Sequence, residues 1–203
     1  MRSWKRGRKR RRSTAVSYGA HLNQYNVIYL DITGFISAVQ RQGISLREVP
    51  NIIVETVRNE LFLLDPELLW EKSFTECLIR HAEKPNGRTL IFIIDEWDAI
   101  IREAANDKIA QKAYLNLLRE WFKNSNFTSK AVAVAYMTGI LPIKKDGAQS
   151  AISDFQEYSI LNPGQFAEFT GFTEREVRRL CKKKRMDFEE VKFWYNGYNF
   201  FRK

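Results

Sequence analysis

Three short apolar runs, separated by longer segments with helical periodicity, constrain the fold of this chain most strongly. The runs cover Asn26–Ile32, Thr89–Asp95 and Lys130–Met137. Continuous apolar runs of this length are typical of parallel strands that are covered by helices. The chain is therefore predicted to be an α/β protein in which these three strands lie adjacent and parallel.

The segments between and after the runs are predicted to be helical. Apolar residues recur every four positions within 45–62, a second helix is expected over 66–83, and residues 110–121 carry an amphipathic pattern. Near the end, Thr173 with Glu176 has the form of a capping box, and Asp187 with Glu190 resembles another helix start. The predicted domains are an α/β domain at 21–162 and a helical part at 163–203.

Most of the formal net charge of +9 comes from the eight Lys and Arg residues at positions 2–12. Like charges repel one another and bury nothing, so residues 1–20 are predicted to be a disordered basic tail. The tail could bind nucleic acid through phosphate contacts that weaken with salt. The alternative is that this segment does not belong to the fold, as after a wrong start or a shifted reading frame.

No run in the chain is long and apolar enough to cross a bilayer, and no apolar signal-peptide segment follows the tail. The two cysteines, Cys77 and Cys181, are far apart and suit a reducing compartment. We therefore expect a cytoplasmic protein without a membrane partner.

Polar side chains stand where each predicted strand ends. Asp31, Asp95 with Glu96, and Thr138 occupy these positions, and ligands of open parallel sheets bind beyond the carboxyl ends of the strands. The sequence LIFIIDE at Leu90–Glu96 has the form of a Walker B segment. In such a segment the first carboxylate holds Mg²⁺ and the second orients or deprotonates the attacking water. The alternative is a strand followed by a solvated acidic turn.

Four neighbouring residues are further candidates, each with an alternative. Asp98 either joins Asp95 as a metal ligand or caps the following helix. Thr138 either senses a γ-phosphate or is a small residue that enters a turn before Gly139. Lys144 and Lys145 either bind phosphate or are solvated.

The phosphate-binding half of an ATP site is missing from the sequence. A P-loop requires GxxxxGK[ST], and none of the ten glycines is followed by lysine. We therefore expect the chain to bind ATP weakly or not at all and to be inactive as an ATPase by itself.

Four stretches resemble the bacterial AAA-ATPase-like family, whose members often carry a C-terminal PD-(D/E)XK nuclease-like domain. The resemblance covers about residues 21–200. Its motifs are IFIIDEWDAI at Ile91–Ile100, MTGILPIKK at Met137–Lys145, GFTEREV at Gly171–Val177 and FWYNGYNF at Phe193–Phe200.

The resemblance implies a three-layer, P-loop-NTPase-like sheet that lacks its P-loop strand and is followed by a small helical part. It implies Mg²⁺ and ATP as cofactors, with Asp95 as metal ligand, Glu96 as the water-activating acid and Thr138 as the sensor. It also implies a middle segment of a longer ATPase, whose partner would be a P-loop-bearing chain or a nuclease-like domain. Asn196 stands where the family has Asp.

Two other functions compete with this interpretation. One is a non-catalytic interaction module with an aromatic partner face. The other is a nuclease that uses the E-x-K pattern at Glu190–Lys192, but this pattern lies in a predicted helix, whereas the nuclease core needs it on a strand.

Overall fold

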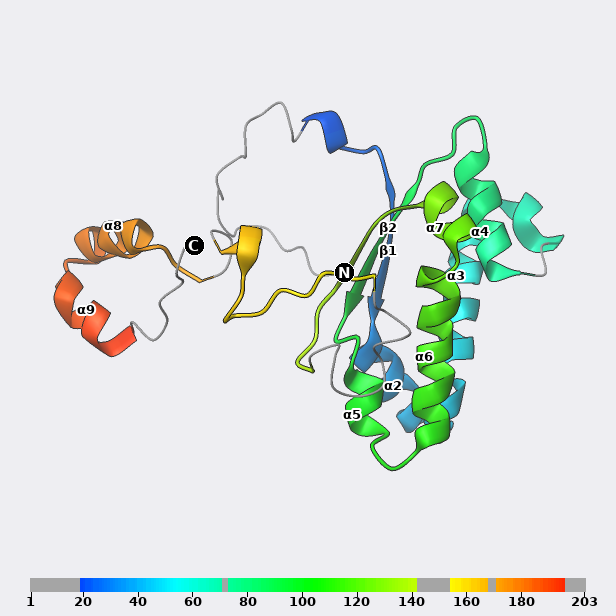
Figure 1. The fold of residues 1–203 in the computed structure, drawn as a ribbon, viewed down its shortest axis with the longest axis horizontal. Helices are drawn as coiled ribbons and strands as arrows, with labels where there is room; N and C mark the ends of the chain where they lie inside the picture. Colours follow the sequence, from blue (N-terminus) through cyan, green and yellow to red (C-terminus); the bar gives the residue numbers. More distant parts are fainter. Residues whose placement is uncertain (1–18, 71–72, 142–153, 168–170, 196–203) are drawn as a thin grey trace. The chain divides into compact units, whose positions relative to one another are not determined.

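A computed structural model of the chain describes residues 19–70, 73–141, 154–167 and 171–195 (Figure 1). The described residues form two compact units, one ending at Phe155 and the other beginning at Gln156. Residues 2–12 of the basic tail and the candidates Lys144 and Lys145 lie outside the described residues. The proposed roles of the tail and of these lysines therefore stay predictions.

The first unit alternates strands and helices. Its elements are β1 (Asn26–Asp31), α2 (Ile32–Arg41), the 3-10 turn η1 (Leu46–Glu48), α3 (Val49–Leu64), η2 (Pro66–Trp70), α4 (Phe74–Glu83), β2 (Leu90–Asp95), α5 (Ala99–Glu103), α6 (Lys108–Phe122), α7 (Ser125–Ala131) and β3 (Val132–Met137). Within the described residues, no helix is long and apolar enough to span a membrane.

The three strands form one sheet in the order β1-β2-β3, and both pairs are parallel. This confirms the predicted arrangement. The register aligns Asp31 with Asp95 and Ile94 with Met137, so the carboxyl ends of the strands share one edge. The third strand begins later than predicted, because Lys130 belongs to the last turn of α7.

The expected single helix over 66–83 is wrong, since η2 and α4 are separate. Ser73 has extended backbone, and its hydroxyl accepts the amide hydrogen of Glu76, which starts a new helix. The start of α3 also differs from the expected Ser45, which caps only η1. Pro50 lies in the first turn of α3, where a missing N–H group breaks no helical hydrogen bond.

The helices α3, α4, α6 and α7 lie on one side of the sheet (Figure 1). The opposite face is apolar and open in the described part of the chain. Val27 and Tyr29 of β1 are 57% and 59% exposed, and Val134 and Tyr136 of β3 are 54% and 50% exposed. The described residues therefore form a sheet with one helical layer, and they do not supply the second layer of a three-layer fold.

The second unit contains η4 (Gly164–Phe166), α8 (Glu174–Lys184) and α9 (Phe188–Tyr195). The predicted capping box is present: the amide of Glu176 donates to the hydroxyl of Thr173, and the amide of Thr173 donates to the carboxylate of Glu176. The carboxylate of Asp187 accepts the amide hydrogen of Glu190. Because residues 190–192 lie inside α9, the E-x-K pattern is helical and not on a strand.

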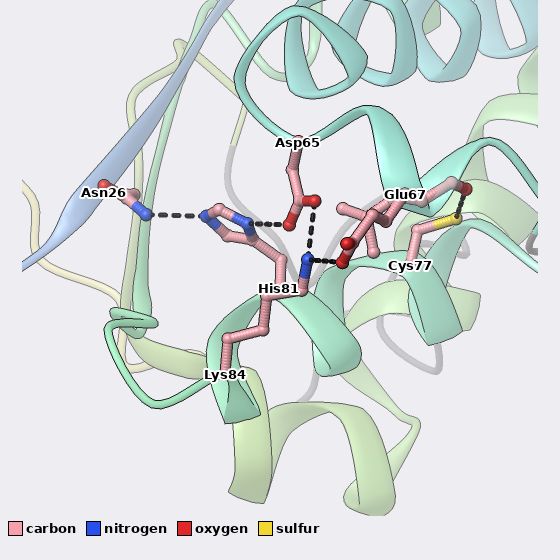
Figure 2. Close-up of polar contacts among 7 residues, drawn as sticks. Asn26, Asp65, Glu67, Cys77, His81 and Lys84 are labelled. Carbon is pink, nitrogen blue, oxygen red and sulfur yellow. Dashed lines mark hydrogen bonds and ion pairs between the residues drawn. The ribbon is translucent and has the colours of Figure 1, made fainter.

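A polar cluster joins α4 to the segment before it and to the start of β1 (Figure 2). Lys84 Nζ donates to Asp65 Oδ1 at 2.6 Å and to Glu67 Oε2 at 2.9 Å. His81 Nδ1 lies 3.3 Å from the other oxygen of Asp65, and His81 Nε2 lies 2.9 Å from Asn26 Nδ2. The cluster therefore fixes the amino end of β1, opposite the edge that carries the predicted site.

This cluster makes stability depend on acid pH. The hydrogen bond from Lys84 is the largest cause that lowers the pKa of the Asp65 carboxyl below its ordinary 3.8. A lowered pKa stabilises the fold above the unfolded-state pKa, and this contribution is lost as the pH falls through the folded-state value. Lys84→Met is therefore expected to be less stable than wild type at about pH 7, with a deficit that shrinks below about pH 3.8.

Urea denaturation across this pH range measures the deficit. The control is Lys108→Met, because the ammonium of Lys108 donates to the neutral side chain of Gln111. A Lys84→Met deficit that is the same in acid and at neutral pH would show that the Asp65 pair does not stabilise the fold.

Candidate functional site

The carboxylate of Asp95, the last residue of β2, is oriented by two hydroxyl groups from the neighbouring strands. The hydroxyl of Thr138, directly after β3, donates to Asp95 Oδ1, and Tyr29 Oη of β1 donates to Oδ2 at 3.2 Å. The amide of Thr138 donates to the carbonyl of Ile94 at 2.9 Å, which extends the β2–β3 pairing to this point. The structure thus brings together Asp95 and Thr138, as the positions of the strand ends predict.

Tyr29 acts in this site as a neutral donor. Its hydrogen bond to Asp95 is the largest cause that raises the pKa of the phenol above 10.0, with smaller contributions from burial and from the charges of Asp95 and Asp31. A phenolate would face these carboxylates, so the protonated form is favoured. The carboxylate of Asp31 is itself occupied, since it accepts the amide hydrogen of Gly34 at 3.0 Å and caps α2.

Glu96 follows Asp95 in a left-handed backbone conformation, with φ of 54°. This conformation costs about 1–2 kcal/mol for a residue with a side chain. The amide of Glu96 donates to the hydroxyl of Thr138 at 3.3 Å, and its carbonyl accepts the amide hydrogen of Ala99 at 2.9 Å. Its carboxylate pairs with Arg102 Nη2 at 2.5 Å and is 39% exposed. Glu96 is therefore held at three points and remains accessible to solvent.

Asp98 is fully buried, and its carboxylate points toward the segment after β3. Its Oδ2 atom accepts the amide hydrogens of Ile140 at 3.2 Å and Leu141 at 2.8 Å. The expectation that it caps the following helix is wrong, because Asp98 occupies the cap position of α5 without a side-chain cap bond. Its predicted metal-binding role is untested and stays a prediction.

Three residues that sequence reasoning missed contribute to this arrangement. Tyr29 reaches Asp95 only through the strand register, which no local pattern specifies. Arg102 lies four residues after Asp98, a spacing that places two helical side chains side by side and is visible in the sequence. A side chain at Gly139 would place its Cβ 2.6 Å from Asp98 Oδ1 and 2.7 Å from the indole of Trp97, so only glycine fits without rearrangement.

The donor set suits a hard cation bound through few protein ligands. In the described part of the chain, no group of three or more His, Cys, Asp or Glu residues could hold a metal ion. Mg²⁺ usually keeps several waters and takes one or two carboxylates together with substrate phosphates. The oxygens of Asp95 and Thr138 fit such a site, and Glu96 places a second carboxylate one residue away.

Comparisons with known proteins relate most of this chain to one protein family. The model of the AAA-ATPase-like family, described as a predicted AAA-ATPase, matches residues 14–149, which is more than half of the chain. The chain is also 23% identical over 124 residues to an uncharacterized protein in the vnfD 5' region of Azotobacter chroococcum mcd 1. That alignment covers 60% of this chain and 24% of the relative, so the chain spans about a quarter of the relative's length. No solved structure matches the chain at a significant level.

Proposed function

Because the chain belongs to the AAA-ATPase-like family, we propose that it carries the metal-binding and water-activating half of a nucleoside triphosphate site. The observation that carries this proposal is the pairing of Asp95 with Thr138 at the carboxyl ends of adjacent parallel strands, with Glu96 next to them. Ligand sites of parallel sheets occur at this edge.

In the proposed site, Asp95 would be the carboxylate that holds Mg²⁺. When bound, Mg²⁺ would neutralise charge on the β- and γ-phosphate oxygens. Glu96 orients the attacking water and accepts its proton, and its exposed carboxylate is suited to this role. The Thr138 hydroxyl, already fixed on Asp95, senses the γ-phosphate from the adjacent strand end. Lys144 and Lys145, which follow in the sequence, would contact the phosphates.

We propose that a P-loop-bearing polypeptide supplies the other half of the site. The sequence contains no GxxxxGK[ST], the motif whose amides and lysine cradle the phosphates. The open face with Val27, Tyr29, Val134 and Tyr136 supports this proposal, because parallel sheets are normally covered on both sides. A second helical layer on this face would complete a three-layer, P-loop-NTPase-like domain. The P-loop can lie elsewhere in a longer protein or on another chain.

The test is a titration of the chain with Mn²⁺ as a probe for Mg²⁺, followed by water-proton relaxation. Asp95→Asn is expected to weaken Mn²⁺ binding about tenfold or more, because the proposed site loses its anionic ligand. Glu60→Gln, which removes an exposed carboxylate from α3, is the matched control and should bind as wild type does. Equal binding by Asp95→Asn and wild type would refute the metal site.

Calorimetric titration with Mg·ATP tests the division of the site into two halves. We expect the 203-residue chain to bind Mg·ATP weakly and to hydrolyse it negligibly, since its carboxylates repel the triphosphate where no cradle is present. Tight, sub-micromolar binding would contradict the proposal that another polypeptide supplies the phosphate cradle.

A further inference from the structure

The carboxylate of Glu96 is oriented by a cation that is itself anchored inside the protein. Arg102, on α5, places Nη2 2.5 Å from Glu96 Oε2 and Nε 3.2 Å from Asp98 Oδ2. The guanidinium thus lies between one half-exposed carboxylate and one that is 0% exposed. A planar guanidinium can contact two carboxylates at once in a fixed geometry, whereas a lysine ammonium is a single point of charge.

Asp98 connects this pair to the segment that follows β3. The same Oδ2 atom that faces Arg102 accepts the amide hydrogens of Ile140 and Leu141. One oxygen of a fully buried carboxylate therefore accepts two amide hydrogens and forms an ion pair with the Arg102 guanidinium. The second oxygen faces Gly139, where a Cβ atom would approach it to 2.6 Å. Oδ1 has no hydrogen-bond partner among the described residues, so the contacts by which Asp98 anchors its neighbours all lie on Oδ2.

These contacts form a continuous ring of interactions that begins and ends at Glu96. Thr138 holds both Asp95 and the amide of Glu96, and the chain runs on from Thr138 to Leu141. From there, Asp98 and Arg102 lead back to the carboxylate of Glu96. The backbone of Glu96 is left-handed, and several contacts converge to hold this unfavourable conformation.

We infer that Arg102 and Asp98 are positioning residues for Glu96, and that Asp98 is the buried anchor of this contact through Oδ2. The role of Glu96 in catalysis rests on the proposed function, but the positioning does not require it. The two acids of the site are then fixed separately, Asp95 by hydroxyl groups and Glu96 by a guanidinium. The start of the segment after β3 and the orientation of Glu96 are coupled through one carboxylate oxygen.

Nuclear magnetic resonance on the metal-free chain tests the inference with two readouts. The first is the side-chain order of Glu96 from carbon relaxation, which a general loss of stability does not change while the protein stays folded. The second is amide hydrogen exchange at Ile140 and Leu141. We expect Arg102→Gln to disorder the Glu96 side chain and to speed exchange at both amides about tenfold or more, the size expected when a hydrogen bond to a charged group weakens.

Three further variants keep the test decisive. Arg102→Lys keeps the positive charge but lacks the planar guanidinium that contacts two carboxylates at once. The Glu96 side chain should therefore be more ordered in Arg102→Lys than in Arg102→Gln, but less ordered than in wild type. Arg88→Gln is the matched control, because Arg88 donates to the side chain of Asn23, and it should change neither readout. If Arg102→Gln does not fold, Asp98→Asn replaces it, since the amide oxygen can still accept from Leu141 while the charge opposite Arg102 is gone.

The outcomes separate this inference from the proposed function. A Glu96 side chain that stays as ordered in Arg102→Gln as in wild type would overturn the positioning role. Mn²⁺ binding that does not depend on Asp95 would overturn the metal site and leave the Arg102 result unaffected. Unchanged order in Glu96 with Mn²⁺ binding that depends on Asp95 would reject the positioning role alone.

Discussion

Replacing Phe92 with alanine is expected to lower the free energy of unfolding by about 3–5 kcal/mol. Phe92 lies at the centre of β2, is fully buried, and packs edge-on against Phe122 and Phe127, with ring centroids 5.6 and 6.2 Å apart. Its ring also lies 5.5 Å from Trp121 of α6. Removing it leaves a cavity where the sheet meets its helical layer. Since domains of this kind are stable by about 5–15 kcal/mol, this single change removes a large share.

Urea denaturation followed by fluorescence and circular dichroism measures the effect. The matched control is Val134→Ala, which shortens an apolar side chain on the open face of the neighbouring strand, where Val134 is 54% exposed. We expect this control to change stability by no more than about 0.5 kcal/mol. A comparable loss in both variants would show that the open face is buried in solution, as association between chains would produce.

Asp98→Ala is expected to destabilise the protein by about 2–3 kcal/mol. The variant removes the charged acceptor of the Ile140 and Leu141 amides and one of the two carboxylates that face Arg102. Hydrogen bonds to charged groups contribute about 1.5–3 kcal/mol each, and water can replace part of this loss because Ile140 is 70% exposed. Thermal melting of Asp98→Ala and Asp98→Asn measures the difference.

We expect Asp98→Asn to lose less stability than Asp98→Ala, because its amide oxygen still accepts from Leu141. Glu103→Gln is a suitable control, since it alters a carboxylate on the same helix and leaves the contacts of Asp98 with Ile140, Leu141 and Arg102 in place. Near-wild-type stability of Asp98→Ala would mean that the buried carboxylate is not an anchor, and would remove the physical basis for the coupling between Leu141 and Glu96.

Local patterns were sufficient to predict the three strands and the starts of α8 and α9. The strand ending at Asp95 is an uninterrupted apolar run, and the capping box at Thr173 and Glu176 is formed as predicted. Such features depend on residues within a few positions of each other, so a single sequence is enough to predict them. The same reasoning failed at Ser73, where a cap inside an apparently continuous helix separates η2 from α4.

The candidate site was only partly predictable. The sequence determined that Asp95, Glu96 and Thr138 end strands of one parallel sheet, because strand polarity and the apolar runs place them at a common edge. The tertiary structure decided how these side chains are held. Whether Tyr29 reaches Asp95, and whether Asp98 turns toward Leu141 or toward its own helix, depends on strand register and side-chain rotamers set by residues more than 40 positions apart. Those long-range contacts leave no periodic trace in the sequence.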